Sequence, residues 1–83
     1  MRTQPSADDQ LRLGEIIRRQ RELAELSMRQ VAAMAGISNP YLSQIERGLR
    51  APSEDVLRAI ADSLNVSADL LRGEEPPAES AEL

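Results

Sequence analysis

Signals that start and stop helices alternate in the middle of the chain, and they constrain the fold more than any other feature. Ser27 can cap a helix that Gly36 ends, and Ser38 can cap a second helix that Gly48 ends. Serine accepts hydrogen bonds from the free N–H groups of a first helical turn, whereas glycine readily adopts the left-handed conformation that stops a helix. The signals therefore predict two short helices joined by a tight turn. These helices cover residues 28–35 and 39–47.

The cap chemistry recurs with supporting residues around it. Ser27 and Gln30 have the S-x-x-Q spacing of a capping box, in which each side chain accepts a hydrogen bond from the other residue's backbone. Three capping serines also have apolar residues at the two positions of a hydrophobic staple. These pairs are Leu26 with Val31, Ile37 with Leu42, and Val66 with Leu71. Because each cap contributes about 1 kcal/mol, the caps define where the helices begin.

Apolar residues recur with helical spacing in the N-terminal part of the chain. The pattern from Leu13 to Ala24 predicts a helix that starts after Asp8 or Asp9. Gly14 lies inside this helix and weakens it by about 1 kcal/mol relative to alanine. A glycine at such a position indicates close packing against another part of the chain.

Two further helices are predicted in the C-terminal part, and no segment has the pattern of a strand. Ser53 caps a helix that runs to the turn at Asn65, and Ser67 caps a short helix that Gly73 ends. The chain is thus expected to form an all-α bundle of five helices. The expected organisation is a disordered segment over 1–8, a domain over 9–72 and an acidic disordered tail over 73–83.

The expected core is aliphatic, because Tyr41 is the only aromatic residue of the 83. Its members are the apolar residues on the inner faces of the predicted helices. They are Leu13, Ile16, Ile17, Val31, Ala32, Ala35, Ile37, Leu42, Ile45, Leu57, Ile60, Ala61, Leu64, Val66, Leu70 and Leu71.

Composition excludes several classes of function. The chain has no cysteine and no histidine, so disulfides, thiolate metal sites and imidazole catalysis are excluded. Lysine is absent too, and no serine has a basic partner to activate it. The longest apolar run, 31–35, is far shorter than the roughly 20 residues of a membrane span. We therefore expect a cytoplasmic protein that is not an enzyme and that needs no metal and no cofactor.

Charge is segregated along the chain, whose net charge is −4. Residues 11–52 hold seven arginines against four glutamates, a net charge of +3, and residues 53–83 have a net charge of −6. Attraction of a nucleic acid depends on where the positive charge lies. The positive part coincides with the two central helices, although any single arginine there is equally well explained as solvation of a helix face.

Three motifs resemble the phage-repressor and Cro type of helix-turn-helix domain, the XRE family. They are L-S-x-R-Q-V-A-x-x-A-G-I-S, Y-L-S-Q-I-E-R-G-x-R-x-P-S and L-x-x-I-A-x-x-L-N-V-S. The resemblance covers about residues 11–72 and implies a lambda-repressor-like bundle of five helices. It also implies binding to double-stranded operator DNA, usually as a dimer, with the helix over 39–47 entering the major groove as the recognition helix.

The resemblance places the base contacts at the start of the recognition helix and on its outer side. These positions are Ser38, Asn39, Pro40, Ser43 and Gln44. Gln44 is the first candidate for direct readout, because glutamine pairs bidentately with adenine, and Asn39 is the second. Gln44 is alternatively a solvated polar residue. Asn39 alternatively caps the helix or donates to a phosphate, and Pro40 is better explained by shaping the first turn.

Phosphate contacts are expected from residues around the two helix starts and the following loop. They are Ser27, Arg29, Tyr41, Ser43, Arg47 and Arg50. Tyr41 has two compatible interpretations, a ring at the edge of the core and a hydroxyl that donates to phosphate. Many family members have glutamine at the first position of the helix over 28–35, where it contacts phosphate. This chain has Met28 there, so that contact is lost.

The resemblance also implies a structural ion pair between Arg21 and Glu46, which would join the first and third helices. If the pair is buried, removal of one partner costs about 3–5 kcal/mol. If it is exposed, the cost is under about 1 kcal/mol. In either case Glu46 would not repel DNA.

The leading interpretation is a sequence-specific transcriptional regulator, more specifically a repressor, that binds a two-fold operator as a homodimer and is nucleoid-associated when bound. Dimer contacts are expected away from the recognition helix, at Leu49, Val56, Leu70 and Leu71. The alternative is a protein-interaction module, such as the antitoxin of a toxin–antitoxin pair that also binds its own operator. The acidic tail is interpreted as inert or as a handle for a partner or protease.

Overall fold

A computed structural model describes residues 7–73 of the chain. These residues form five helices and no strand. The bounds are α1 (Ala7–Leu23), α2 (Met28–Ala35), α3 (Asn39–Glu46), α4 (Glu54–Leu64) and α5 (Ala68–Arg72). The prediction of an all-α bundle of five helices is thus confirmed.

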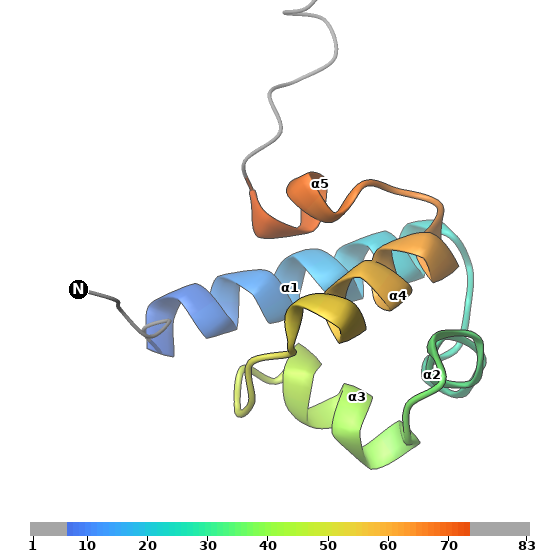
Figure 1. Cartoon of the computed structure of the whole chain (residues 1–83), viewed down its shortest axis with the longest axis horizontal. Helices are drawn as coiled ribbons and strands as arrows, with labels where there is room; N and C mark the ends of the chain where they lie inside the picture. The colour runs from blue at the N-terminus through green and yellow to red at the C-terminus, as the bar shows by residue number, and fades with distance from the viewer. Residues whose placement is uncertain (1–6, 74–83) are drawn as a thin grey trace, which may run out of the picture.

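The helices pack so that α2 and α3 lie on one side of α1 and α4, and α5 lies on the other (Figure 1). The long α1 contacts α3 and α5, whereas α2 contacts both α3 and α4. The helix-turn-helix unit formed by α2 and α3 therefore lies at the end of the molecule opposite α5 (Figure 1).

Serine caps begin α2, α3, α4 and α5. The Ser27 side chain accepts a hydrogen bond from the Gln30 amide at 3.0 Å, and the Gln30 side chain accepts one from the Ser27 amide at 2.7 Å. This is the predicted capping box. The Ser38 and Ser53 hydroxyls accept from the third helical amide at 3.1 Å and 3.2 Å. Ser67 does the same at 3.0 Å.

Left-handed residues end α2, α4 and α5. Gly36 has φ of 75° and Gly73 has φ of 77°, whereas α4 ends at Asn65 with φ of 60°. Asparagine tolerates this conformation better than most residues, because its short polar side chain bonds locally. The predicted stops are therefore confirmed at all three helices.

The core is built from aliphatic side chains of all five helices. Its buried members are Ile17, Val31, Ala32, Leu42, Ile45, Leu57, Ile60, Ala61, Leu64 and Leu71. Every one of them was predicted. Leu70 is the exception among the predicted residues, since it is half-buried and lies outside the core cluster. Five residues outside the predicted core list also pack against the cluster, and one of them, Tyr41, was expected at the edge of the core. They are Leu26, Met28, Tyr41, Val56 and Ala68.

Two helix ends differ from the prediction. The first helix begins at Ala7, before Asp8, so the expected disorder is wrong for these two residues. The acidic Asp8 and Asp9 fall in its first turn, where they favour the helix dipole. Arg47 is the C-cap of α3 rather than its last residue. The expectations for residues 1–6 and 74–83 lie outside the described part of the chain.

No helix within residues 7–73 is long and apolar enough to cross a membrane.

Candidate nucleic-acid interface

The third helix has one face in the core and one face toward solvent. Leu42, Ile45 and Glu46 are buried, which fixes the inner face against the rest of the bundle. Asn39 and Pro40 are exposed at the start of the helix, and Arg47 is exposed at its end. The buried face therefore holds the polar outer face of α3 in a defined orientation.

The structure brings all five predicted base-contact residues to this outer face and to the first turn of α3. Ser38, Asn39 and Pro40 are exposed, whereas Ser43 and Gln44 are half-buried. Ser38 is the cap, because its hydroxyl accepts from the Tyr41 amide at 3.1 Å. Asn39 is the first residue of the helix and not its cap, so the capping alternative for Asn39 no longer applies.

Pro40 falls in the first turn of α3, as predicted. An N–H group at this position would have no partner within the helix, so proline costs nothing there. Its ring is exposed beside Asn39. Pro40 thus shapes the start of α3, as expected from the sequence, and its exposed ring presents an apolar surface there.

The predicted phosphate-contact residues lie at the start of α2 and around α3. Ser27 and Arg29 are exposed, and Ser27 is engaged in the capping box. Arg47 and Arg50 are exposed at the end of α3 and in the loop that follows. The guanidinium carbon of Arg50 lies 5.1 Å from the centroid of the Tyr41 ring. This contact between two predicted phosphate-contact residues was not predicted from the sequence.

Acidic residues are rare in the segment formed by α2, α3 and the loop that follows, although the exposed Glu22 of α1 lines a hollow together with Ser43 and Arg47. Glu46 is the only acidic residue between positions 26 and 53, and its side chain is only 3% exposed. The same segment contains the three exposed arginines at positions 29, 47 and 50. The unit formed by α2, α3 and the following loop therefore presents positive charge without an exposed carboxylate of its own.

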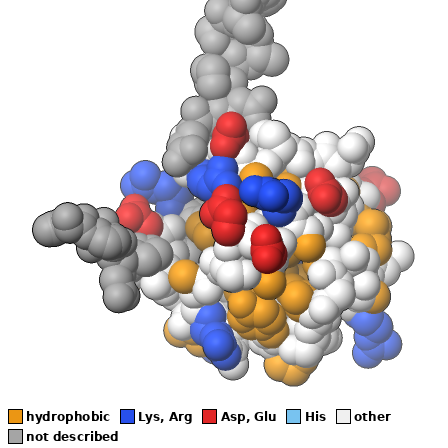
Figure 2. Space-filling view, in the orientation of Figure 1, with side chains coloured by type: hydrophobic (Ala, Val, Ile, Leu, Met, Phe, Trp, Pro, Cys, Tyr) orange, Lys and Arg blue, Asp and Glu red, His pale blue; other side chains and the backbone are white. Residues whose placement is uncertain are grey.

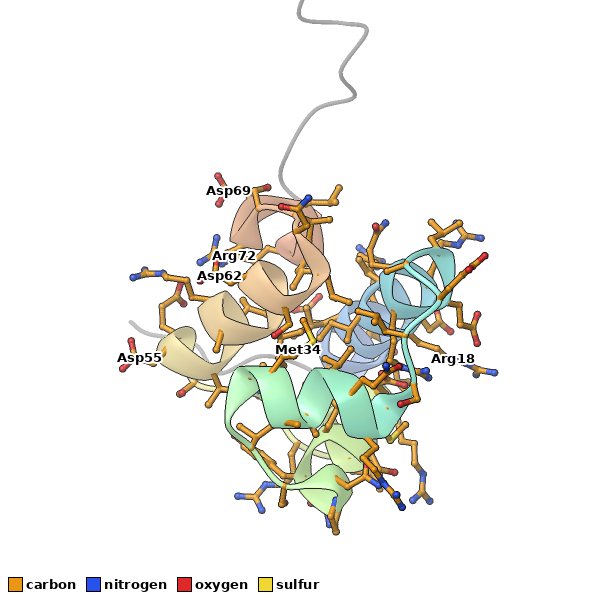
Figure 3. The ribbon with its side chains drawn as sticks, turned by 90° about the vertical axis from the view of Figure 1, so that its right-hand side faces the viewer. Arg18, Met34, Asp55, Asp62, Asp69 and Arg72 are labelled. Carbon is orange, nitrogen blue, oxygen red and sulfur yellow. The ribbon has the colours of Figure 1, made fainter. Side chains whose placement is uncertain are left out.

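Acidic side chains gather on the other half of the molecule. Asp55, Asp62 and Asp69 lie on the side of α4 and α5, away from α3 (Figure 3). Figure 2 shows acidic and basic side chains mixed over α4 and α5. Arg72 pairs with Asp69 at 2.6 Å and also with Glu54, which ties α5 to the start of α4.

Glu46 is neutralised by Arg21, as predicted. The Arg21 Nε donates to Glu46 Oε2 at 2.7 Å, and its Nη2 donates to Oε1 at 3.1 Å. The third nitrogen, Nη1, donates to the Leu26 carbonyl at 3.1 Å. The hydrogen bond to Glu46 raises the pKa of Arg21 above its ordinary value. A raised pKa keeps this stabilisation complete at neutral pH, and it is lost only as the pH rises through the raised value.

Close contact with α1 fixes the position of α3 further. A Cβ atom on Gly14 would lie 2.4 Å from the Glu46 carbonyl oxygen and 2.6 Å from that of Ile45. The prediction of close packing at Gly14 is confirmed, and the partner is the last turn of α3. Because both neighbours are backbone atoms, they cannot move aside by changing rotamer.

Met28 is half-buried and packs against the core. Beside it lies a hollow of about 280 Å³, whose other lining residues include Arg18, Ser43 and Arg47. Arg18 forms an exposed ion pair with Glu22 at 3.1 Å. Sequence reasoning did not single out Arg18 as part of this region, because α1 is far from α3 along the chain.

The four predicted dimer residues are not equally available. Leu49 is 61% exposed, and Val56 and Leu70 are half-buried. Leu71 is fully buried in the core and cannot contact a second molecule without unfolding α5. The prediction of a dimer contact at Leu71 is therefore wrong.

Comparison with known proteins places the chain among helix-turn-helix proteins. The helix-turn-helix family model HTH_3 matches residues 17–71. An uncharacterized HTH-type transcriptional regulator of Mycobacterium tuberculosis is 64% identical over 58 residues, which are 70% of this chain. The chain spans 41% of the length of that relative. YazB of Bacillus subtilis, also named an uncharacterized HTH-type transcriptional regulator, is 43% identical over 58 residues, or 70% of this chain and 84% of YazB.

Two solved structures share the fold. The restriction-modification controller protein C.AhdI of Aeromonas hydrophila superposes with a TM-score of 0.75 at 26% identity, over 77% of this chain and 97% of that one. The clp gene regulator ClgR of C. glutamicum gives a TM-score of 0.76 at 26% identity. That match covers 89% of this chain and 92% of ClgR.

Proposed function

Because the chain belongs to the helix-turn-helix family, we propose that it is a DNA-binding transcriptional regulator whose α3 reads base edges in the major groove. One observation carries the proposal. The outer face of α3 and the adjacent arginines are exposed at one end of the molecule, and the only acid of that segment is buried against Arg21. This arrangement suits a polyanionic surface that has polar base edges between its phosphates.

Within this interface we assign direct readout to Gln44 and Asn39. Each amide side chain offers one acceptor and one donor group, the pattern that pairs with N7 and N6 of adenine. Such a pair gives about 1–3 kcal/mol of discrimination per base pair. Gln44 is half-buried, so its side chain has fewer conformations to lose on binding than that of a fully exposed residue.

We assign the contacts with the DNA phosphates to Arg29, Arg47 and Arg50 and to the backbone amides at the starts of α2 and α3. Amide groups at a helix start point their N–H bonds at an anion, and the helix dipole favours negative charge there. Ser27 and Ser38 cap these two helices and keep the first turns well formed. Backbone contacts of this kind fix the orientation of α3, whereas the base contacts supply the sequence preference.

We further propose a homodimer on a two-fold operator, with half-site centres about 10 base pairs, or a multiple of that, apart. One recognition helix reads few base pairs, so a second copy is needed for adequate discrimination. The apolar area that extends from α4 toward α3 in Figure 2 supports a contact there. Leu49 and Val56 are its proposed members, with Leu70 from α5. Repression would follow from promoter occupancy by such a dimer in the cytoplasm.

Selection from a random pool of duplex DNA, at a salt concentration near that of the cell, tests this function. The protein should retain a two-fold motif, and Gln44→Ala should relax one position in each half-site. Gln10→Ala is a matched control, because Gln10 lines a different hollow with Leu57 and Arg72. It should leave the motif unchanged. If no motif is enriched, the regulator proposal fails and a protein-interaction module without sequence-specific DNA binding takes its place.

A further inference from the structure

The contact between Arg50 and Tyr41 links the loop after α3 to the beginning of α3. Tyr41 is the third residue of the helix, and Arg50 follows the last helical residue by four positions. The Tyr41 ring is half-buried and packs against the core, so its position is fixed. The Arg50 guanidinium, with its carbon 5.1 Å from the ring centroid, thus lies against a ring that packs on the core. Attraction between a cation and the face of an aromatic ring favours this placement.

The start of the loop is fixed as well. Gly48 has φ of 78°, and a Cβ atom there would lie 2.6 Å from Leu11 Cδ2 and 3.0 Å from Leu11 Cα. The Leu49 amide donates to the Gln44 carbonyl at 2.8 Å. The backbone two residues before Arg50 is therefore held against α1, and the chain next to Arg50 is tied to α3. The Arg50 side chain is exposed, and contacts with α1 and α3 hold the backbone just before it.

We propose that Tyr41 is a positioning residue whose ring holds Arg50 beside the recognition helix, ready to donate to a phosphate of the DNA backbone. This inference rests on the proposed function. A free arginine must give up many conformations to meet a phosphate, whereas an arginine already held on a ring loses fewer. The guanidinium has five N–H donors, and those not directed at the ring are free to bind an oxygen anion.

The proposal decides between two roles of Tyr41. If the hydroxyl donates to phosphate, the ring alone is not enough for full affinity. If the ring acts only by holding Arg50, the hydroxyl is dispensable, and loss of the ring has no effect on DNA affinity once Arg50 is absent. Tyr41 and Arg50 would then act as one unit, whereas Tyr41 and Arg47 would act independently.

A double-mutant cycle on DNA affinity tests this coupling with a duplex that carries the selected motif. Tyr41→Phe should bind like the wild type, whereas Tyr41→Leu should bind roughly two- to fivefold more weakly. Arg50→Ala should lower the slope of log affinity against log salt by about 0.9, the value for one phosphate contact. Adding Tyr41→Leu to Arg50→Ala should cause no further loss. In the Arg47→Ala background, by contrast, Tyr41→Leu should weaken DNA binding by the same factor as it does in the wild type.

A measurement without DNA separates this inference from the proposed function. The ring current of Tyr41 should move the side-chain protons of Arg50 upfield in the NMR spectrum, in the wild type and in Tyr41→Phe but not in Tyr41→Leu. Circular dichroism checks that Tyr41→Leu is folded, and Tyr41→Met is the substitute if it is not.

Three results would overturn the inference. They are the absence of the upfield shift, equal losses from Tyr41→Phe and Tyr41→Leu, and additive losses from Tyr41→Leu and Arg50→Ala. If the shift is present but the wild type binds no DNA, the proposed function fails and with it the phosphate role of Arg50.

Discussion

The half of the molecule formed by α2 and α3 and the half formed by α4 and α5 are built alike but charged differently. Both halves begin their helices with serine caps and bury aliphatic faces in one core. Residues 26–53 have three exposed arginines and one buried acid, whereas residues 54–73 have four acids against two arginines. Caps and apolar faces therefore determine the fold, and the distribution of charge determines which half suits DNA.

In the first half, contacts with α1 hold α3 in place, and the second half, residues 54–73, has no equivalent of these contacts. The Arg21–Glu46 pair and the close approach of Gly14 hold α3 against α1. In the second half the charged contacts that Arg72 makes with Glu54 and Asp69 are exposed to solvent. A part-buried ion pair and a close helix–helix contact thus hold the recognition helix in its orientation, whereas α5 is tied to α4 by exposed ion pairs.

The largest effect is expected from Glu46→Ala, which leaves the part-buried Arg21 guanidinium with the Leu26 carbonyl but without its carboxylate partner. We expect the free energy of unfolding to fall by about 3–5 kcal/mol in urea denaturation. Glu22→Ala is the matched control, because it removes an exposed partner of Arg18 and should cost under about 1 kcal/mol. Equal losses for the two variants would show that the Arg21–Glu46 pair stabilises the fold no more than the exposed Arg18–Glu22 pair does.

Gly14→Ala should have the next largest effect. Alanine improves the helix by about 1 kcal/mol, but its Cβ would press on the carbonyl oxygens of Ile45 and Glu46. We expect a net loss of about 1–3 kcal/mol in thermal unfolding, as for overpacked cores. Glu15→Ala, at the exposed neighbouring position, should stay within about 0.5 kcal/mol of the wild type. A stabilised Gly14→Ala variant would contradict the close contact.

The caps allow a direct comparison of the two halves. Ser38→Ala and Ser67→Ala each remove one cap and should each lower the free energy of unfolding by about 1 kcal/mol. Only Ser38→Ala should also weaken DNA binding in a fluorescence anisotropy titration, since Ser38 shapes the start of the recognition helix. If Ser67→Ala weakens DNA binding equally, the contrast between the halves fails.

The smallest effects on stability are expected from exposed arginines. Arg29→Ala and Arg58→Ala should each stay within about 0.5 kcal/mol of the wild type. Their salt dependence should differ, because Arg29 lies at the start of α2 and Arg58 lies on α4. Arg29→Ala should reduce the slope of log affinity against log salt by about 0.9, whereas Arg58→Ala should leave it unchanged. The reverse result would place the DNA on the other half.

The helices could be predicted from the sequence because their signals are local. Each capping serine and each left-handed terminator acts within a few residues, so the predicted ends of α2 to α5 agree with the structure to within one residue. Leu70 and Leu71 mark the limit of this reasoning. In a helix of five residues, periodicity cannot decide which of two adjacent leucines faces the core.

The candidate site was predictable where a motif carries it and not where a contact depends on the tertiary path. The Arg21–Glu46 ion pair joins residues 25 positions apart in the sequence. Its prediction rested on the family resemblance and not on residue spacing. The contact of Arg50 with Tyr41 depends on where the loop runs after Gly48, so no local pattern indicated it. The nearness of Arg18 to Arg47 is likewise a consequence of helix packing.

DNA is proposed to bind the half of the molecule formed by α2 and α3. The most direct test is a titration of ¹⁵N-labelled protein with the selected duplex, followed by amide chemical shifts in the NMR spectrum. The account predicts the largest shifts at residues 27–30, at 38–44 and in the loop at 47–50, with small shifts in α4 and α5. Shifts concentrated in α4 and α5, with α3 unchanged, would contradict it.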